Sequence, residues 1–541
     1  MDRQQTDQLS SAAPVVVTAQ QMQAIETTIF HAGMPVAALM EKVAGRSAQW
    51  LVQHFPRDPT NRVGVIVGPG HNGGDALVIA RELHHYGYHV IIWCPFTQLK
   101  ELTAQHKAYG EYLGIENTQS SADLRQCDLI IDGGFGLGLT RPLSGALAQG
   151  IERINRTPIP VVSIDLPSGL ETNTGQVLGI AIRADHTLCL GLWKLGLLQD
   201  QAQPWVGQLH LIPFDVPSAA IQTILATSPT TCCITAAAAI SRLPLPRSPI
   251  AHKYQAGHAL LIAGSRQYAG AALLASQGAI ASGVGMLTII VPESLRLMLV
   301  SQLPEALVIG ATETAEGAIA ALPSDFSWDR YDAIACGPGL TIAAAPVVEA
   351  VLQSACPVVL DADGLNILAQ DDPASQLRER SAPTLLTPHL GEFRRLFPSL
   401  LQAADTPGLA ARQAATTANC TLVIKGAMSA IAHRDGQLWI NPKSTAALAR
   451  GGSGDVLTGL ATGLAAQLYQ TEPTSQTLLD AAIAAVWWHA QAGRYLASQQ
   501  TDLGCVPSQL ARALPGVLAE QLAMTSTFAA TIQPDCRNGQ L

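Results

Sequence analysis

The sequence has few charged residues and lacks several patterns that mark particular protein classes. Charged side chains make up 13% of its 541 residues and hydrophobic ones 48%, which excludes an extended, solvated chain. The formal net charge is -9 and no run of Lys or Arg is present, so we expect no nucleic-acid partner. The ten cysteines contain no C-x-x-C zinc spacing, which predicts reduced thiols and a cytoplasmic protein.

The chain also lacks a secretory signal and a membrane span. Its first residues have no apolar core of the kind that a signal peptide needs. Residues 267–292 carry no charge and exceed the roughly 20 residues that cross a bilayer. Their glycines and the β-branched end of the stretch favour a buried helix followed by a buried strand. We therefore expect no membrane partner.

Two series of short apolar runs, each alternating with helical patterns, predict two α/β domains. Continuously apolar strands between helices are typical of a mostly parallel sheet covered on both faces. An uncharged stretch between Asp215 and Arg242 is interpreted as the connection, with a middle that fits a helix. The last residues lose their periodicity, which predicts a flexible tail. The expected parts are residues 1–220, 230–520 and 521–541.

Three strands of the first domain run into polar, glycine-rich turns, and ligands bind at this edge of open α/β sheets. The first turn, 68–75, precedes a helical pattern that begins at Leu77, and its backbone N–H groups could approach a phosphate. An ordinary tight turn fits it equally well, and the absence of a following Lys excludes a P-loop. Asn72, Asp132 and Ser168 lie one in each turn. Their side-chain oxygens could together bind one small cation, or each residue could be only a turn residue or a helix cap.

The ordered motifs over residues 18–215 resemble NAD(P)H-hydrate epimerases. They are GMP with LME at 33–41, HNGGD at 71–75, DGGFGLG at 132–138, DLPSGL at 165–170, and ADHT leading to KLG at 184–196. The resemblance implies a Rossmann-like doubly wound sheet, a potassium ion on Asn72, Asp132 and Ser168, and Asp165 as the acid/base group. The hydrated dinucleotide would contact His71, Asn72, Gly73, Gly74, Asp75, Gly136, Leu137, Gly138, Leu139, Thr140, Arg141, Pro142 and Asp165.

In the second domain a glycine loop, GGSGDVLTG at 451–459, opens a helix. Backbone N–H groups of such a loop can hold a transferring phosphoryl group while Asp455 accepts a hydroxyl proton. Asp455 could instead only cap the helix. The loop is similar to that of the ribokinase-like superfamily, whose members include sugar and hydroxymethylpyrimidine kinases.

A finer match over residues 235–515 resembles ADP-dependent NAD(P)H-hydrate dehydratases. It includes HKY at 252–254, GPGL at 337–340, DADGLN at 361–366, LTPHLGE at 386–392 and KGA at 425–427. The resemblance implies a ribokinase-like α/β fold and Asp455 as the base, with magnesium inferred from phosphoryl-transfer chemistry. It places the hydrate at Ala271, Gly339, His389 and Asp455, and ADP or AMP at Lys425, Gly426, Ala427, Met428, Ser429 and Gly454.

Together the two resemblances imply one repair enzyme for hydrated NADH and NADPH. The first domain would interconvert the S and R epimers, and the second would dehydrate the S form while ADP becomes AMP and phosphate. One alternative is a small-molecule kinase whose first domain only regulates it. Another makes the first domain a binding scaffold, although Asn72, Asp75, Asp132, Asp165 and Ser168 form a polar set that a scaffold does not need. The oligomeric state, including a homo-oligomer, stays open.

Overall fold

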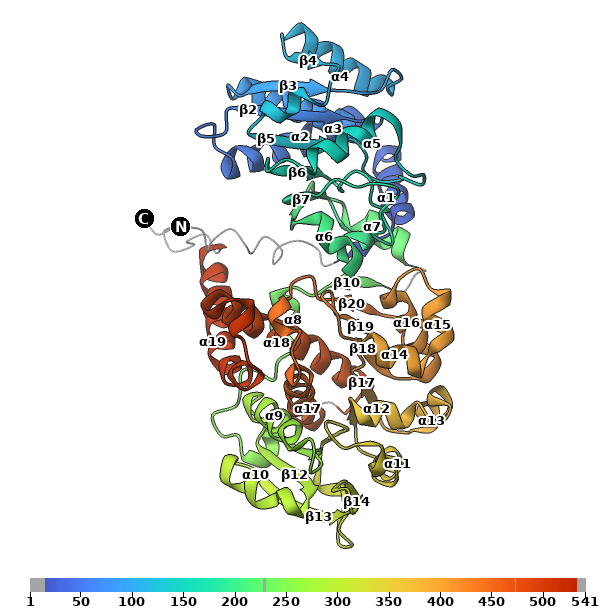
Figure 1. Cartoon of the computed structure of the whole chain (residues 1–541), viewed down its shortest axis with the longest axis vertical. Coiled ribbons are helices and arrows are strands. Elements are labelled where there is room, and N and C mark those ends of the chain that lie inside the picture. Colours follow the sequence, from blue (N-terminus) through green and yellow to red (C-terminus); the bar gives the residue numbers. More distant parts are fainter. Residues whose placement is uncertain (1–14, 227–229, 472, 533–541) are drawn as a thin grey trace, which may run out of the picture. The chain divides into compact units, whose positions relative to one another are not determined.

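The computed structural model describes residues 15–226, 230–471 and 473–532, and the chain divides into two compact units (Figure 1). Unit 1 is Met1–Thr231 and unit 2 is Cys232–Leu541. The division falls within the stretch expected to connect two domains. Helix α7 (Ser218–Leu225) lies in the first part of this stretch, and residues 227–229 in its middle lie outside the described residues. No disulfide joins the nine cysteines that lie within the described residues.

Unit 1 contains a seven-stranded parallel sheet in the order β4-β3-β2-β5-β6-β7-β9. The apolar runs of this unit that predict strands, 63–67, 90–93, 129–131, 161–164 and 187–190, all belong to it. A strand buried on both faces is apolar throughout. Its strands are β2 (Arg62–Val67), β3 (His89–Trp93), β4 (Glu116–Thr118), β5 (Leu129–Gly133), β6 (Val161–Ile164), β7 (His186–Leu190) and β9 (Gln208–Ile212). A separate parallel pair joins β1 (Val16–Val17) to β8 (Trp193–Lys194).

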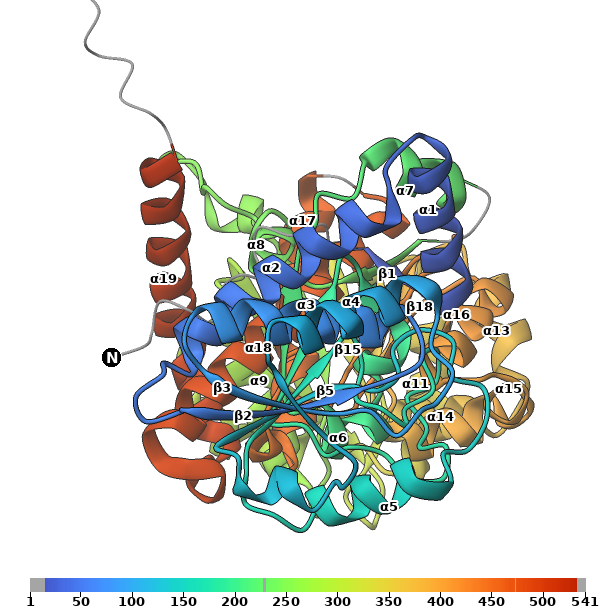
Figure 2. The same cartoon turned by 90° about the horizontal axis from the view of Figure 1, so that it is seen from above.

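Helices cover both faces of this sheet, as Figure 2 shows for α3 and α5. Val63 and Val65 of β2 belong to one apolar core with residues of α2 and α3, whereas Ile66 belongs to a second core with residues of α5. This alternation follows from the two-residue period of a strand. The helices of unit 1 other than α7 are α1 (Ala19–His31), α2 (Val36–His54), α3 (His71–His85), α4 (Glu101–Tyr112), α5 (Gly145–Ile154) and α6 (Gln203–Val206).

Unit 2 contains an eleven-stranded sheet in the order β10-β20-β19-β18-β17-β16-β15-β11-β12-β13-β14. Its middle strands, from β18 to β13, are parallel, and antiparallel pairs flank them. The strands are β10 (Thr231–Cys233), β11 (His258–Ile262), β12 (Met286–Pro292), β13 (Leu307–Glu313), β14 (Ile319–Ala321), β15 (Ala333–Cys336), β16 (Val358–Leu360), β17 (Thr384–Leu386), β18 (Thr421–Ile424), β19 (Ala430–Ala432) and β20 (Leu438–Ile440).

The helices of unit 2 again form two layers (Figure 1). Leu261, Ala335 and Val359 pack in one core with α17 (Ser453–Thr471) and α18 (Ser475–Gly504), while α11 (Ala345–Gln353) and α16 (Pro407–Ala418) contact the sheet as well. The others are α8 (Ala236–Ile240), α9 (Ala269–Ala281), α10 (Arg296–Gln302), α12 (Asp363–Leu368), α13 (Pro373–Glu379), α14 (Leu390–Leu396), α15 (Pro398–Ala403) and α19 (Pro507–Ile532). The uncharged stretch tested as a membrane span is α9 followed by β12, as predicted.

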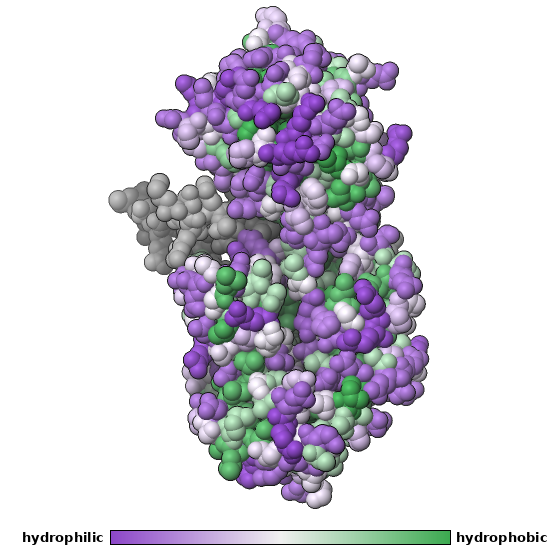
Figure 3. All heavy atoms as spheres, viewed as in Figure 1, coloured by the Kyte–Doolittle hydropathy of each residue, from purple (hydrophilic) through white to green (hydrophobic). Residues whose placement is uncertain are grey.

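Helix α19 continues to Ile532, beyond residue 521 where the tail was predicted to begin. Residues 533–541 lie outside the described part. On the face drawn in Figure 3, apolar residues lie among polar ones, and no helix of the described residues is long and apolar enough to cross a membrane.

Two candidate active sites

The first candidate site lies where β2, β5 and β6 of unit 1 end. The parallel register pairs Val67 with Gly133 and Asp132 with Ser163, so the residues that follow these strands emerge at one edge of the sheet. Ligands of open α/β sheets bind at this edge. The three turns predicted to form one site therefore lie next to one another.

Helix α3 begins at His71, earlier than the start near Leu77 that the glycine-rich segment predicted. Gly73 and Gly74 lie in its first turn, where a side chain would collide with other parts of the fold. A Cβ on Gly73 would lie 2.0 Å from the carbonyl oxygen of Gly68, and one on Gly74 would lie 2.7 Å from Cε of Met40. The paired glycines thus serve close packing at the start of a helix, and they place Asn72 and Asp75 in its first turns.

Two of the three predicted potassium ligands are in direct contact. The hydroxyl of Ser168 donates to Oδ1 of Asp132 over 2.6 Å, and the Ser168 N–H donates to Oδ2 over 2.8 Å. The third, Asn72, lies on the Asp165 side of this turn, since a Cβ on Gly136 would be 3.1 Å from Oδ1 of Asn72 and 3.3 Å from Oδ2 of Asp165. The amide nitrogen Nδ2 of Asn72 is buried without a hydrogen-bond partner in the described structure. Buried polar atoms are normally paired, so this one indicates a place for a ligand.

The described residues hold no group of three or more His, Cys, Asp or Glu side chains placed to bind a metal. The predicted potassium ligands are of another kind, because only Asp132 is a carboxylate and Asn72 and Ser168 would contribute neutral oxygens. Burial raises the pKa of Asp132, while hydrogen bonds from Ser168, Ser163 and Gly134 lower it.

Asp165 forms a buried ion pair that the sequence did not reveal. Its Oδ1 accepts a hydrogen bond from Nζ of Lys194 over 2.6 Å, and the two side chains are 7% and 1% exposed. Lys194 also donates to the carbonyl of Leu190, and the Leu190 N–H donates to Oδ1 of Asp165 over 3.2 Å. Asp165 itself has a φ of 67°, a conformation that is uncommon for a residue with a side chain. The fold therefore holds this carboxylate in one orientation.

Two further carboxyls surround this pair. Burial raises the pKa of Asp75 well above its usual range; Asp165 and Glu26 also raise it, and Lys194 opposes them. Burial raises the pKa of Glu26 to about 7, with Lys194 lowering and Asp165 raising it. Glu26 was not among the predicted site residues. Groups with such displaced pKa values are common at sites of acid–base chemistry.

The second substrate segment, Gly136 to Pro142, runs outward from this cluster. Gly136 lies against Asn72 and Asp165, whereas Thr140, Arg141 and Pro142 are exposed. The structure thus brings the inner end of the predicted binding loop to the ionisable groups and leaves its outer end in solvent.

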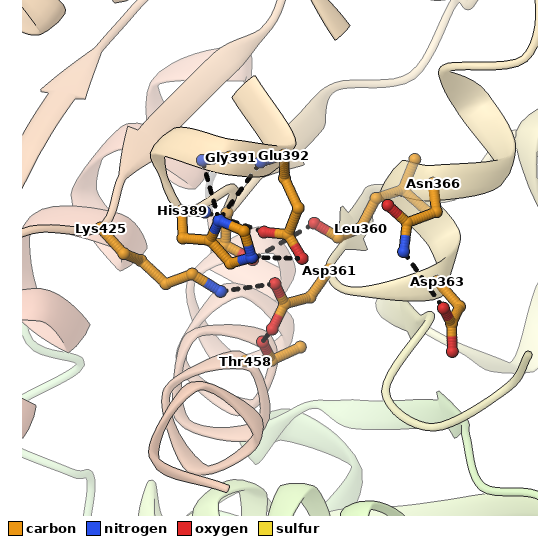
Figure 4. Close-up of polar contacts among 10 residues, drawn as sticks. Leu360, Asp361, Asp363, Asn366, His389, Gly391, Glu392, Lys425 and Thr458 are labelled. Carbon is orange, nitrogen blue, oxygen red and sulfur yellow. Dashed lines mark hydrogen bonds and ion pairs between the residues drawn. The ribbon is translucent and has the colours of Figure 1, made fainter. Parts of the chain in front are cut away.

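The second candidate site surrounds Asp361, at the end of β16 in unit 2 (Figure 4). Its Oδ1 accepts a hydrogen bond from Nζ of Lys425 over 2.7 Å, and its Oδ2 accepts one from the hydroxyl of Thr458 over 2.6 Å. Asp361 is 2% exposed and Lys425 is 23% exposed. Asp361 was not among the predicted site residues, although an acid directly after a buried strand indicates a position at the ligand-binding edge of a sheet.

The predicted base, Asp455, lies in the first turn of α17 beside this pair. Burial raises the pKa of Asp455 to about 7, with Asp361 raising it and Lys425 lowering it. A Cβ on the preceding Gly454 would lie 3.3 Å from Nζ of Lys425. The lysine therefore approaches the backbone at the start of the helix, where N–H groups without helical partners can bind an anion.

His389 has a structural role at the start of α14. Its Nδ1 accepts hydrogen bonds from the N–H groups of Gly391 and Glu392, over 2.9 Å and 3.2 Å, and the Glu392 side chain accepts from the His389 N–H over 2.8 Å. Its Nε2 lies 3.5 Å from Oε1 of Glu392 (Figure 4), and the side chain is 56% exposed, so the ring can still contact a ligand. Burial raises the pKa of Glu392, which Lys425 lowers and Asp361 raises.

Other predicted dehydratase residues lie around Asp361. A Cβ on Gly339 would lie 2.9 Å from Cβ of Ala271, so these two predicted substrate contacts are neighbours. The same loop reaches Asp361, because a Cβ on Gly337 would lie 1.8 Å from its carbonyl oxygen. The predicted nucleotide segment, 425–429, is the turn between β18 and β19, and Gly426 and Ala427 are exposed there.

Comparison with known proteins assigns a family to each unit. Residues 36–196 match the family described as YjeF-related protein N-terminus, and residues 259–516 match the NAD(P)H-hydrate dehydratase family. The bifunctional NAD(P)H-hydrate repair enzyme Nnr of Thermosynechococcus vestitus is 52% identical over 510 residues, covering 94% of this chain and 98% of that relative. The enzyme of the same name from Synechocystis sp. is 50% identical over 499 residues, covering 92% and 94%.

A solved structure, that of the ADP/ATP-dependent NAD(P)H-hydrate dehydratase from Bacillus subtilis co-crystallized with ATP and Mg²⁺, is 33% identical. It covers 53% of this chain and 97% of its own, with a TM-score of 0.45. The two family matches confirm the predicted pairing of a Rossmann-like unit with a ribokinase-like unit. The chain belongs to the family of bifunctional NAD(P)H-hydrate repair enzymes.

Proposed function

We propose that this protein repairs hydrated NADH and NADPH in two steps. Unit 1 interconverts the S and R epimers, and unit 2 dehydrates the S form to NADH or NADPH while ADP becomes AMP and phosphate. The observation that carries the proposal is a matching arrangement in the two units. Each has a buried aspartate paired with a lysine, beside a carboxyl whose burial raises its pKa to about 7.

In unit 1, Asp165 is proposed as an acid/base group at the hydrated carbon of the nicotinamide ring. Segments 71–75 and 136–142 hold the dinucleotide. The contact of Gly136 with both Asn72 and Asp165 supports this placement, because a glycine there leaves room for a ligand beside the carboxylate. A positioned carboxylate is suited to moving the hydroxyl proton.

Potassium is proposed at Asn72, Asp132 and Ser168. These residues fit such an ion, since Asp132 and Ser168 are in contact and Asn72 carries an amide oxygen that lies beside Gly136 and Asp165. Hard oxygen donors of this kind suit a hard cation. A bound potassium ion would supply positive charge that attracts the oxygens of the dinucleotide.

In unit 2, Asp455 is proposed to remove the proton from the substrate hydroxyl as that oxygen attacks the terminal phosphate of ADP. Lys425 and the Gly454 N–H face this phosphate, and the turn 425–429 holds the rest of the nucleotide. Expulsion of phosphate from the phosphorylated carbon, with loss of a ring proton, then restores the dihydropyridine. The hydrate itself is proposed to lie against Ala271, Gly339 and His389.

Magnesium is proposed to accompany the nucleotide in unit 2. The carboxylates of Asp361 and Glu392 both interact electrostatically with Lys425, and carboxylate oxygens are the ligands that magnesium prefers. The ion would neutralise charge on the transferring phosphate. We also propose a cytoplasmic location, which the absence of disulfides among the nine described cysteines supports.

The test combines the purified protein, both epimers of hydrated NADH, and ADP with Mg²⁺. Recovery of the NADH absorbance from both epimers is expected. The variant Asp165→Ala is expected to consume the S epimer and leave the R epimer, apart from slow spontaneous epimerisation. A stable phosphorylated product without recovery of NADH would instead identify a small-molecule kinase and refute the repair function.

A further inference from the structure

Helix α1 is fixed beside Lys194 by a short strand pair. In the pair of β1 with β8, Val17 lies opposite Lys194, and α1 begins two residues later at Ala19. Thr18 caps this helix, since its hydroxyl oxygen accepts from the Gln21 N–H over 3.2 Å. The first turn is held further by the Ala19 N–H, which donates to Asn173 over 2.8 Å. The start of α1 is therefore fixed relative to the ion pair of Asp165.

Glu26 lies on the inner stripe of α1. Ala19, Met22 and Ile29 are buried at positions that share one face of the helix, and the spacing of three or four residues puts Glu26 between Met22 and Ile29. No hydrogen bond holds its carboxyl among the residues that the structure describes. A carboxyl on an otherwise apolar stripe is costly unless it meets compensating charge or serves a reaction.

The loop after β5 connects α1 with Asp165. A Cβ on Gly136 would lie 3.3 Å from Oδ2 of Asp165, and one on Gly138 would lie 3.4 Å from Nε2 of Gln23. Gln23 is one turn before Glu26 on α1. The predicted substrate loop thus spans the space between the Asp165 carboxylate at its inner end and the helix that carries Glu26.

The charged groups that face Glu26 come from three other elements: Lys194 of β8, Asp165 after β6, and Asp75 of α3. Together they make three carboxyls and one ammonium in a largely buried cluster. Full ionisation of all three carboxyls would leave uncompensated negative charge there, so the cluster retains a proton near neutral pH. Lys194 hydrogen-bonds to Asp165, which leaves Glu26 and Asp75 as the groups that hold it.

We propose that Glu26 is a second catalytic residue of the epimerase, which exchanges a proton with the substrate hydroxyl on the face of the ring opposite Asp165. The proposal rests on the placement of the hydrated ring beside Asp165. It explains why α1, a helix outside the parallel sheet, presents an acid to this cluster. Inversion at one carbon needs proton transfer on both faces, which a single carboxylate in a fixed orientation cannot provide.

The carboxylic acid of Glu26 gives its proton to the hydroxyl, the C–O bond breaks, and water leaves with the bonding electron pair. The lone pair of the ring nitrogen forms a C=N bond, which gives an iminium ion. Water adds to the other face and loses a proton to the Asp165 carboxylate. Asp165 then releases its proton to solvent and Glu26 takes one up from solvent, which restores both groups. The reverse reaction uses the same groups in opposite roles.

Burial raises the pKa of Glu26 to about 7, which suits a group that must both give and accept a proton near neutral pH. Asp165 differs from Glu26 in geometry, because its Oδ1 accepts a hydrogen bond from Nζ of Lys194. The two carboxyls thus occupy different environments within one cluster, which is the usual way in which a site separates an acid from a base.

The experiment measures interconversion of the two epimers by the full-length protein without ADP, followed by chromatography and corrected for the spontaneous rate. Glu26→Gln is expected to lower kcat by about 100-fold or more, with little change in KM. Glu26→Asp is expected to recover part of the rate, and the limb of the pH profile near neutrality is expected to vanish in Glu26→Gln. Glu152→Gln, which removes an exposed acid of α5 paired with Arg156, is the matched control.

ADP-dependent conversion of the S epimer, measured in the same samples, checks that unit 2 is active, and hydrogen exchange of the unit 1 segments checks that unit 1 is folded in each variant. An unchanged pH profile and wild-type kcat in Glu26→Gln would overturn the proposal, and so would a loss confined to KM. Failure of the wild-type protein to interconvert the epimers would overturn the epimerase function itself, which keeps the two failures distinct.

Discussion

The two units solve a similar electrostatic problem with different access to solvent. In unit 1 the ammonium of Lys194 pairs with Asp165, and in unit 2 that of Lys425 pairs with Asp361, over 2.6 Å and 2.7 Å. Beside each pair burial raises the pKa of one carboxyl, Glu26 or Asp455, to about 7.

The difference lies in the lysine, since Lys194 is 1% exposed and Lys425 is 23% exposed. The ammonium of a buried lysine interacts with groups inside the protein, here the Asp165 carboxylate. The ammonium of a partly exposed lysine can also reach the phosphate of a ligand. The comparison indicates that unit 1 uses its pair as fixed charge and that unit 2 shares its pair with a nucleotide.

The largest expected effect tests whether Asp455 acts in dehydration alone and not in epimer interconversion. Asp455→Asn should lower kcat for ADP-dependent recovery of NADH from the S epimer by about 10³-fold, because the hydroxyl loses the base that accepts its proton. Epimer interconversion by the same variant should keep its wild-type rate. The NADH absorbance reports the first activity and chromatography of the epimers the second.

Asp371→Asn, at an exposed position beyond α12, is the matched control and should change neither rate. Wild-type recovery of NADH by Asp455→Asn would show that the raised pKa at this position has no catalytic meaning. The lysine–aspartate pair of unit 2 would then not lie beside a proton-transfer group, and the proposed similarity between the two units would be wrong.

The next prediction distinguishes the role of Lys194, which pairs only within the protein, from that of Lys425, which would also contact the nucleotide. Lys194→Met should lower the free energy of unfolding of unit 1 by about 3 kcal/mol or more, because it leaves the buried Asp165 carboxylate without its counter-ion. Lys425→Met should cost unit 2 less, since Asp361 keeps the hydrogen bond from Thr458, while affinity for ADP should fall. Hydrogen exchange resolved along the chain measures the two units separately, and calorimetric titration measures ADP binding.

The double variant Lys194→Met with Asp165→Asn removes both charges and should recover much of the lost stability. Equal losses of stability for the two lysine variants, together with unchanged ADP affinity in Lys425→Met, would contradict the assignment of different roles.

Much of the fold was predictable because buried parallel strands and their turns are local features of the sequence. The strands that end at Ile164 and Leu360 are continuous apolar runs, and an acid follows each of them directly, Asp165 and Asp361. The start of α3 was not predictable, since Gly73 and Gly74 indicate a loop unless the close approach of Gly68 and Met40 is known.

The roles of Glu26 and Lys194 in the first site could not be predicted from the sequence for a related reason. An acid in an amphipathic helix ordinarily faces solvent, and a single lysine after a strand ordinarily does too. Only the pairing of Val17 with Lys194, between segments far apart in the sequence, turns both residues toward Asp165. Long-range pairings of this kind leave no local signal.

The smallest expected effect concerns how the stability of unit 1 depends on pH. The pKa of Glu26 is about 7 in the folded protein and 4.5 without its surroundings, so the folded state binds more protons between these values. The stability of the wild-type unit should therefore fall as pH rises from about 4.5 to about 7. Glu26→Gln should remove this loss and be more stable than wild type above neutrality, by about 1–3 kcal/mol, with little difference in acid. Hydrogen exchange of unit 1 at several pH values measures this stability difference, with Glu152→Gln as the control.

A stability difference between Glu26→Gln and wild type that does not vary with pH would mean that Glu26 stays ionised in the folded protein. The environment of Glu26 would then differ from that of Asp455.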